Sequence, residues 1–314
     1  MQTKTIGKSD LNCSRLAYGA WRNPGVKTPA DLTAEKKEIG KRAFLAAFEA
    51  GYTLFDHADI YGRTMGESLF GELLREHPRI RREIVIATKC GIRLAGDPTP
   101  AAQHRYDFSR EHILWSCDQS LKRLGIETID LYQLHRPDVL MDPCEVAEAF
   151  DTLHRQGKVR YFGVSNFLPS TVAMLQSALS APIVGQQVEI HLGRLDCFFD
   201  GTLDQCLQLN ITPLAWSPLG GGILGDGGRV PEAHPNRSVL ENLQTTMDSM
   251  AKSLGTSRTA LALAWLLKHP AGIIPIVGSL NPAHIQEAAR ADTLELSREQ
   301  WYDLLIAARG KRLP

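Results

Sequence analysis

The chain has 314 residues, with 35 basic and 35 acidic side chains and therefore no formal net charge at neutral pH. A balanced charge argues against nucleic-acid or anionic-membrane binding that rests on bulk charge, and it favours small ligands. The six cysteines show no metal-ligand spacing, and no apolar run reaches the roughly 18–20 residues that span a membrane. We therefore expect a cytoplasmic protein with one domain over residues 1–314 and no metal.

Short apolar runs alternate with longer amphipathic segments along the chain. Runs that are apolar on both faces are typical of parallel strands covered on both sides. Eight such strands, with helices between them, predict an α/β fold, a (β/α)₈ TIM barrel. An open doubly wound sheet is the alternative, but no GxGxxG motif follows the first strand. The predicted strands span residues 16–20, 52–56, 84–89, 129–135, 159–165, 183–189, 212–217 and 273–278.

Two short strands around a turn at residues 7–10 predict an N-terminal β-hairpin that covers one end of the barrel. Two loops, residues 91–108 and 218–237, are longer than a barrel requires. Both follow the carboxyl ends of strands, where barrel enzymes keep their sites, and long loops in a compact domain are often functional.

Local signals indicate where several helices begin and end. Ser109 is a candidate cap for a helix that ends at Gly125. Ser238 and Glu241 have capping-box spacing at the start of another helix. A third helix covers residues 260–268 and stops before a proline.

Polar side chains end several of the apolar strands. Three of these side chains form one chemical unit with Tyr61, which lies five residues after a strand end. Lys89 ends an apolar strand and needs a partner, because an isolated buried ammonium is costly, and Asp56 at the neighbouring strand end is the natural counter-ion. Considered alone, Tyr61 could instead pack on the rim of the barrel, and His135 could be a hydrogen-bonded histidine of the core. Together they predict carbonyl reduction, with Tyr61 as general acid and a neutral His135 orienting the carbonyl oxygen. An ammonium beside Tyr61 is expected to lower its pKa.

Two other interpretations of these residues remain. His57 and Asp59 stand two residues apart and are candidates for a metal site, although no further ligand pattern lies nearby. Lys89 is also a candidate for Schiff-base chemistry, which the order of the four residues disfavours without excluding it.

The chain resembles the aldo-keto reductase family, and within it the branch of bacterial general oxidoreductases. The resemblance is carried by the segments LFDHADIYG, IATKCG, YQLHRPD and FGVSNF. The likeness runs from GAW near the start to PIVGSLNPAHIQEA near the end. It implies a barrel that reduces aldehydes or ketones to alcohols with NADP(H). Asp56, Tyr61, Lys89 and His135 match the catalytic residues of the family.

The resemblance also implies a set of cofactor contacts. In chain order, we expect amide contacts to the nicotinamide and then an aromatic ring that stacks on it. A segment around the pyrophosphate and a site for the adenosine 2′-phosphate follow. Gly278 and His284 stand where many relatives carry lysine and arginine, so we expect NADP(H) to be preferred and NAD(H) to be possible. The implied residues are Ala20, Trp21, Asp56, Ser165, Asn166, Gln187, Trp216, Ser217, Leu219, Gly221, Gly278, Ser279, His284 and Glu287.

Substrate choice is expected to depend on Trp21, His57 and the loop 91–108. The resemblance extends to potassium-channel β subunits, which keep the barrel and the cofactor but serve as binding partners. A regulatory subunit with little turnover is therefore the alternative function. Steady-state turnover of a simple aldehyde distinguishes the two.

Overall fold

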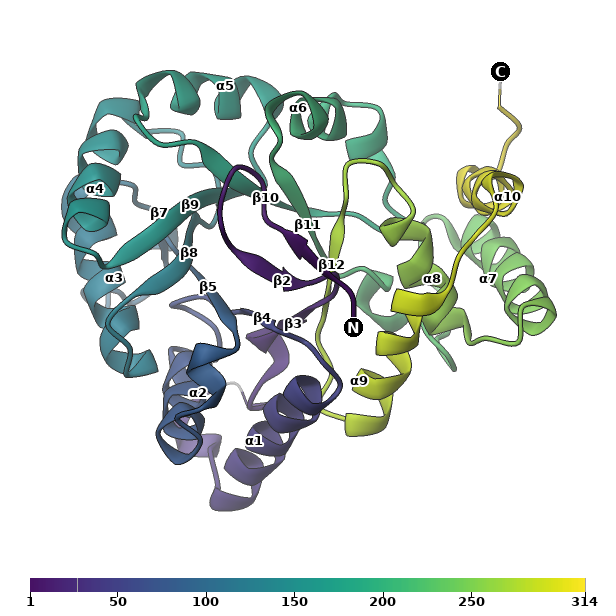
Figure 1. Cartoon of the computed structure of the whole chain (residues 1–314), viewed down its shortest axis with the longest axis horizontal. Coiled ribbons are helices and arrows are strands. Elements are labelled where there is room, and N and C mark those ends of the chain that lie inside the picture. The colour runs from purple at the N-terminus through teal and green to yellow at the C-terminus, as the bar shows by residue number, and fades with distance from the viewer. Residues whose placement is uncertain (27, 314) are drawn as a thin grey trace.

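The computed structural model describes residues 1–26 and 28–313 of the chain. In this part, eight parallel strands close into a barrel in the order β10-β11-β12-β3-β4-β5-β8-β9 (Figure 1). The predicted TIM barrel is confirmed, because each predicted strand coincides with one of these. They are β3 (Ala17–Gly19), β4 (Leu54–Asp56), β5 (Val85–Cys90), β8 (Ile129–Leu134), β9 (Val159–Ser165), β10 (Ile183–Glu189), β11 (Thr212–Trp216) and β12 (Ile274–Val277).

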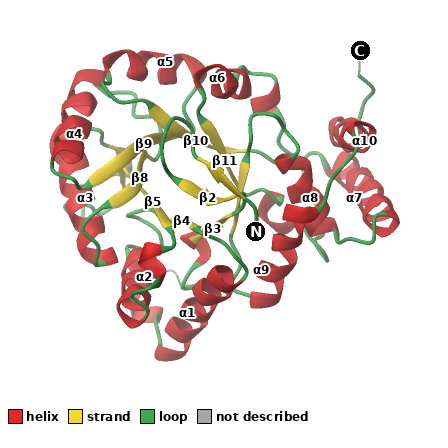
Figure 2. Ribbon diagram, in the orientation of Figure 1, coloured by secondary structure: helices red, strands yellow, loops and turns green. Residues whose placement is uncertain are grey.

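The helices surround the barrel on its outside, as Figure 2 shows. Every residue of β5 and β8 is buried, which agrees with strands whose two faces meet the barrel interior and the helical layer. The helices are α1 (Ala34–Glu49), α2 (Met65–Glu76), α3 (Arg110–Leu124), α4 (Pro143–Arg155), α5 (Pro169–Ala178), α6 (Thr202–Leu209), α7 (Arg237–Ser253), α8 (Arg258–Leu267), α9 (Pro282–Ala289) and α10 (Arg298–Arg309).

The N-terminal hairpin is also confirmed. Strands β1 (Thr3–Thr5) and β2 (Asn12–Ser14) pair antiparallel. Ile6 and Leu11 of this hairpin are buried in the same cluster as Leu54, Leu131 and Leu214 of the barrel strands. The hairpin therefore covers the amino-terminal end of the barrel, so that the carboxyl ends of the strands form the open end.

Parallel register places the polar strand ends at one level. Asp56 pairs with Ala87, and Gln187 pairs with Ser165. Lys89 lies two residues beyond Ala87 on β5. Side chains that are far apart in the sequence therefore meet at the open end of the barrel.

The predicted helix signals were right at two positions and wrong at one. The Ser109 side chain accepts a hydrogen bond from the His112 N–H, and Gly125 ends α3 with a left-handed backbone. The predicted capping box at Ser238 is wrong, because α7 already begins at Arg237. The Arg237 guanidinium binds the Glu241 carboxylate at 2.7 Å, so this carboxylate does not reach back to a cap.

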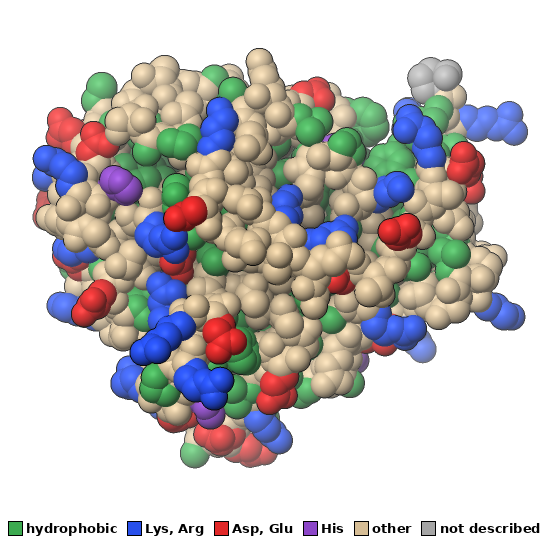
Figure 3. Space-filling view, viewed as in Figure 1, with side chains coloured by type: hydrophobic (Ala, Val, Ile, Leu, Met, Phe, Trp, Pro, Cys, Tyr) green, Lys and Arg blue, Asp and Glu red, His purple; other side chains and the backbone are tan. Residues whose placement is uncertain are grey.

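Both long loops lie at the carboxyl ends of barrel strands. The first contains a small antiparallel pair, β6 (Ile92–Arg93) with β7 (Arg105–Tyr106), and the second contains a turn at Gly220–Gly222, where all three glycines have positive φ. On the face shown in Figure 3, basic and acidic side chains are interspersed. Within residues 1–26 and 28–313, the helices are too short or too polar for a membrane span.

Candidate active site

A cavity of about 560 Å³ opens at the carboxyl ends of the barrel strands. Its walls include the ends of β4, β9, β10, β11 and β12 and residues of both long loops. Tyr61 and His135 line it together with Asp56. This is the place where parallel barrels assemble side chains from several strands into one site.

Lys89 lies at the base of this site and is fully buried. Its ammonium donates to Asp56 Oδ2 at 2.7 Å, to the carbonyl oxygen of His57 at 2.7 Å and to the Tyr61 hydroxyl at 3.1 Å. Three donors thus meet three oxygen atoms, which compensates for the loss of water around a buried charge. The predicted Lys89–Asp56 pair is present, and Tyr61 contacts it directly.

Asp56 is held from two sides. Its other carboxylate oxygen, Oδ1, accepts from the Gln187 side-chain amide at 2.9 Å and from the Gln133 amide at 3.5 Å. Both glutamines are buried, and they come from β8 and β10, which do not adjoin β4 in the barrel. Asp56 therefore connects Lys89 to the frame of the barrel.

The electrostatics of the site keep each group in a defined state. Burial lowers the pKa of Lys89, but Asp56 and Tyr61 raise it more, so the net shift is upward and the ammonium stays charged. Burial raises the pKa of Tyr61 and outweighs the downward effect of Lys89. The expected net lowering is therefore wrong: Lys89 acts in that direction, but removal of water from the phenol dominates.

His135 lines the cavity beside Tyr61, with the two ring centroids 5.7 Å apart and the planes at 76°. Burial, and then the positive charges of Lys89 and Arg136, lower the pKa of His135 well below its usual range. The imidazole is therefore neutral at physiological pH. A neutral ring can donate one N–H hydrogen bond to a substrate oxygen.

A second group of polar side chains fixes one aromatic wall. Asn166 has a left-handed backbone (φ 62°) directly after β9, and its amide donates to the Ser165 hydroxyl at 2.7 Å. Its side-chain oxygen accepts from the Trp216 indole N–H at 2.9 Å. Trp216 is thereby held in one orientation at the cavity, with the Arg136 guanidinium 5.4 Å from its ring centre.

The far end of the cavity is built by the loop after β11 and the start of α9. Ser217, Leu219 and Gly221 line it from the loop, and Ser217 has a left-handed backbone (φ 48°). Further lining residues are Gly278, Ser279, His284 and Glu287. Glu287 accepts from the Arg290 guanidinium at 3.2 Å, so its negative charge is paired.

Two residues of the expected site lie elsewhere. The Ala20 side chain is fully buried in the main core and does not line the cavity. The His57 ring is also fully buried, with its centre 4.6 Å from the Phe70 ring and 5.8 Å from the Phe44 ring. The expectation that His57 lines the cavity is therefore wrong. Only its backbone carbonyl oxygen contacts Lys89.

The exposed Trp21 lines the cavity as expected. Two arginines, Arg22 and Arg136, also line it and were not predicted from the sequence. Arg22 follows Trp21, and its guanidinium is 3.5 Å from the carbonyl oxygen of Gly221 across the cavity mouth. Arg136 follows His135. The sequence could have indicated both arginines, because each directly follows a predicted site residue near the end of a strand.

The side chains of His57 and Asp59 have separate surroundings. The His57 ring lies among aromatic residues, whereas Asp59 accepts from the Ser116 hydroxyl at 2.8 Å. Among residues 1–26 and 28–313, no group of three histidine, cysteine or acidic side chains has the arrangement of a metal site.

Known proteins resemble this chain over nearly its whole length. The model of the aldo/keto reductase family matches residues 15–307. The 6-dehydroglucose reductase of Novosphingobium aromaticivorans is 41% identical over 99% of this chain and 97% of its own. Oxidoreductase YdhF of Escherichia coli is 37% identical over the full length of both chains. The solved glycerol dehydrogenase of Gluconobacter oxydans has a TM-score of 0.86 at 26% identity, covering 99% of this chain and 97% of that one. The chain therefore belongs to the aldo-keto reductase family of oxidoreductases.

Proposed function

We propose that this protein reduces aldehydes or ketones to alcohols with NADPH, and that Tyr61 is the general acid. The observation that carries the proposal is the contact of one buried ammonium, Lys89, with both the Tyr61 hydroxyl and the Asp56 carboxylate. His135 lines the same cavity as Tyr61. A carbonyl oxygen bound here would meet Tyr61 as a proton donor and His135 as a second hydrogen-bond donor. The positive charge of Lys89 would stabilise the anion of Tyr61.

Each residue has a separate part in this proposal. When bound, the nicotinamide supplies the hydride that the carbonyl carbon receives. Tyr61 gives its proton to the carbonyl oxygen, and the adjacent Lys89 ammonium stabilises the phenolate that forms. Asp56 holds Lys89 in place, and neutral His135 donates a hydrogen bond to the same oxygen. Because all three directions around the Lys89 ammonium are occupied and its pKa is raised, we favour this role over Schiff-base chemistry.

The cavity has the donor groups that a nicotinamide dinucleotide needs. The amide and hydroxyl groups of Ser165, Asn166 and Gln187 can hold the carboxamide, and the Trp216 ring offers a flat surface for the nicotinamide. Glycine-rich backbone at Gly221 suits a pyrophosphate. His284 and Ser279 would face the 2′-phosphate, so we propose that NADPH is preferred and that NADH is accepted.

The test is a panel of aldehydes and ketones assayed by the loss of NADPH absorbance. 6-Dehydroglucose belongs in the panel because a relative at 41% identity is named for its reduction. Turnover of several carbonyl compounds supports the proposal. Tight cofactor binding without turnover of any of them would instead favour a regulatory subunit. The proposed location is the cytoplasm, as the unpaired state of the six cysteines favours.

A further inference from the structure

Asp59 is a buried acid that the proposed chemistry does not use. It lies in the loop of residues 57–61, which connects the end of β4 to the catalytic candidate Tyr61. Its exposed fraction is 8%. The position of Tyr61 relative to Lys89 depends on this loop, so the contacts that fix the loop bear on the proton donor.

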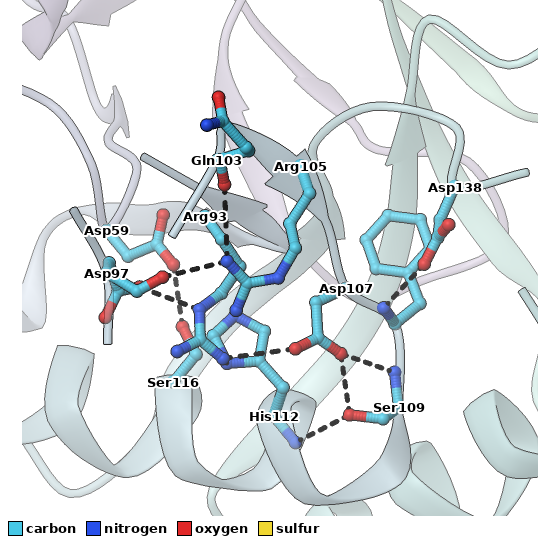
Figure 4. A network of polar contacts seen from close by, with 11 residues as sticks. Asp59, Arg93, Asp97, Gln103, Arg105, Asp107, Ser109, His112, Ser116 and Asp138 are labelled. Carbon is cyan, nitrogen blue, oxygen red and sulfur yellow. Dashed lines mark hydrogen bonds and ion pairs between the residues drawn. The ribbon is translucent and has the colours of Figure 1, made fainter. Parts of the chain in front are cut away.

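Besides the bonds from the Lys89 ammonium to His57 and Tyr61, three further hydrogen bonds attach the loop to its surroundings. The His57 N–H donates to the carbonyl oxygen of Ala87 at 2.8 Å, and the Asp59 N–H donates to the carbonyl oxygen of Lys89 at 3.1 Å. The third contact comes from a side chain: Asp59 Oδ2 accepts from the Ser116 hydroxyl of α3 at 2.8 Å, as Figure 4 shows. Asp59 thus joins the loop both to the strand that carries Lys89 and to the helix beside it.

The second carboxyl oxygen of Asp59 is buried and has no hydrogen-bond partner among the described residues. The nearby cation, Arg123 of α3, is committed to Glu67 of α2 at 2.7 Å. The Glu67 carboxylate also accepts from the Thr88 hydroxyl and adds negative charge near Asp59. A charged Asp59 would therefore have the hydrogen bond from Ser116, the backbone N–H of Ile60 close by, no ion pair and the Glu67 carboxylate as a neighbour.

Two further titratable groups near Asp59 are neutral. Cys90 of β5 and Tyr132 of β8 are both fully buried, and burial raises the pKa of each well above its usual value. Burial, and then the charge of Glu67, raise the pKa of Asp59 itself to about 7, against the smaller opposing effects of Ser116, Arg123 and the Ile60 backbone N–H. The carboxyl group therefore changes its charge near neutrality.

We propose that Asp59 is a positioning residue, which holds the Tyr61 loop against Ser116 in its uncharged form and loosens it when it ionises. This rests on the proposed role of Tyr61 as the acid. An ionised carboxylate here gains by drawing in water for its unpartnered oxygen, and the cost of burying the charge with that oxygen unpaired favours local opening. The sign follows: reduction is fastest below the pKa of Asp59 and slows as the pH rises through it.

The first test is the pH profile of single-turnover reduction with saturating NADPH between pH 6 and pH 8. At pH 8 an acid of pKa about 7 is roughly 90% ionised, so the rate falls by up to about tenfold if only the uncharged form holds the loop. Asp59→Asn keeps an acceptor for Ser116 but cannot ionise. We expect this variant to lose the decline and to exceed wild type at pH 8, with unchanged NADPH affinity.

The second test removes the other partner. Ser116→Ala should lower the single-turnover rate over the whole range while the Kd for NADPH stays the same. Ser120→Ala is the matched control, because Ser120 is a buried serine one turn further along α3 that contacts Arg123 and not the loop. Hydrogen exchange of the amides of residues 57–61 should be faster in Ser116→Ala than in Ser120→Ala.

A wild-type pH profile in Asp59→Asn, or equal rates and equal exchange in the two serine variants, would overturn the proposal. If Asp59→Asn does not fold, the comparison of the serine variants decides. If wild type reduces no carbonyl compound at all, the proposed function fails instead. Hydrogen exchange at pH 6 and pH 8, corrected for its intrinsic pH dependence, then still shows whether ionisation loosens the loop.

Discussion

Lys89 organises the site at the scale of single residues. A fully buried ammonium is tolerated because Asp56, Tyr61 and the His57 carbonyl group each accept one hydrogen bond from it. Asp56 in turn is held by Gln187. The position of the Tyr61 hydroxyl, the proposed proton donor, thus follows from the need to satisfy one buried charge.

Trp216 should report cofactor binding. If the nicotinamide stacks on its ring, NADPH quenches tryptophan fluorescence, and much of this change is lost in Trp216→Leu. The chain has five tryptophans, so a background signal remains. An unchanged amplitude on titration of the variant would argue against the stacking position.

Cofactor preference should respond to position 284. His284 is exposed and lines the far end of the cavity. A hydrogen bond to a charged group contributes roughly 1.5–3 kcal/mol, so His284→Arg should tighten NADPH binding by about tenfold or more. NADH lacks the 2′-phosphate, and its Kd should stay constant. Equal tightening of both cofactors in binding titrations would show that residue 284 does not face this phosphate.

The sequence could indicate Asp56, Lys89 and His135, because a polar residue that follows an apolar barrel strand must lie at the open end. It could not give the direction of the Tyr61 pKa, which depends on burial that only the folded loop creates. The orientation of His57 was equally hidden, since aromatic residues from α1 and α2 form its surroundings.

At the scale of elements, an ionic network gives the loop 91–108 a defined shape. The Arg93 guanidinium donates to Asp97 at 2.7 Å and to Asp107 at 3.1 Å, and it lies 3.3 Å from His112 Nδ1 of α3 (Figure 4). Arg93 is largely buried, whereas the neighbouring Ile92 lines the cavity. The network therefore fixes one wall of the predicted substrate site.

Loss of this network should affect substrate binding more than chemistry. In Arg93→Met, the KM for carbonyl substrates should rise by roughly 3–10-fold, while the Kd for NADPH changes little. Arg110→Met is the control, because Arg110 is an exposed residue next to the loop whose partner Glu148 is also exposed. Steady-state kinetics that are the same for both variants would contradict a role for the network.

The barrel strands were predictable because both of their faces are apolar, but the small hairpin β6–β7 was not. Its strands have only two residues each, and Arg93 stabilises it through side chains that are distant in the sequence. The start of α7 was misjudged for a related reason. The ion pair of Arg237 with Glu241 engages the carboxylate that the predicted capping box would have used.

At the scale of the whole molecule, buried His57 links stability to pH. Burial, and then the charge of Lys89, lower the pKa of His57 to about 3, whereas an unfolded histidine titrates near 6.5. Between these values the unfolded state binds the additional proton. The contribution of His57 to stability is therefore complete above about pH 6.5 and is lost as the pH falls toward 3.

Substitution of this residue should change acid stability. From pH 7 to pH 5, His57 accounts for about 2 kcal/mol of lost unfolding free energy, at about 1.4 kcal/mol per pH unit below 6.5. His57→Leu has no titrating ring at this position. Its unfolding free energy, measured by denaturant unfolding at pH 7 and pH 5, should therefore fall by about 2 kcal/mol less than that of the wild type. Parallel losses in both proteins would show that His57 is protonated in the folded state.

The central claim is that Tyr61 donates the proton during hydride transfer, and Tyr61→Phe tests it most directly. The phenyl ring keeps the packing against His135 but removes the hydroxyl that Lys89 contacts. With NADPH deuterated at the transferred position, wild type should deliver deuterium to the carbonyl carbon of the product. Tyr61→Phe should do so at least ~10²-fold more slowly, with an unchanged Kd for NADPH. Deuterium transfer at the wild-type rate in this variant would contradict the account.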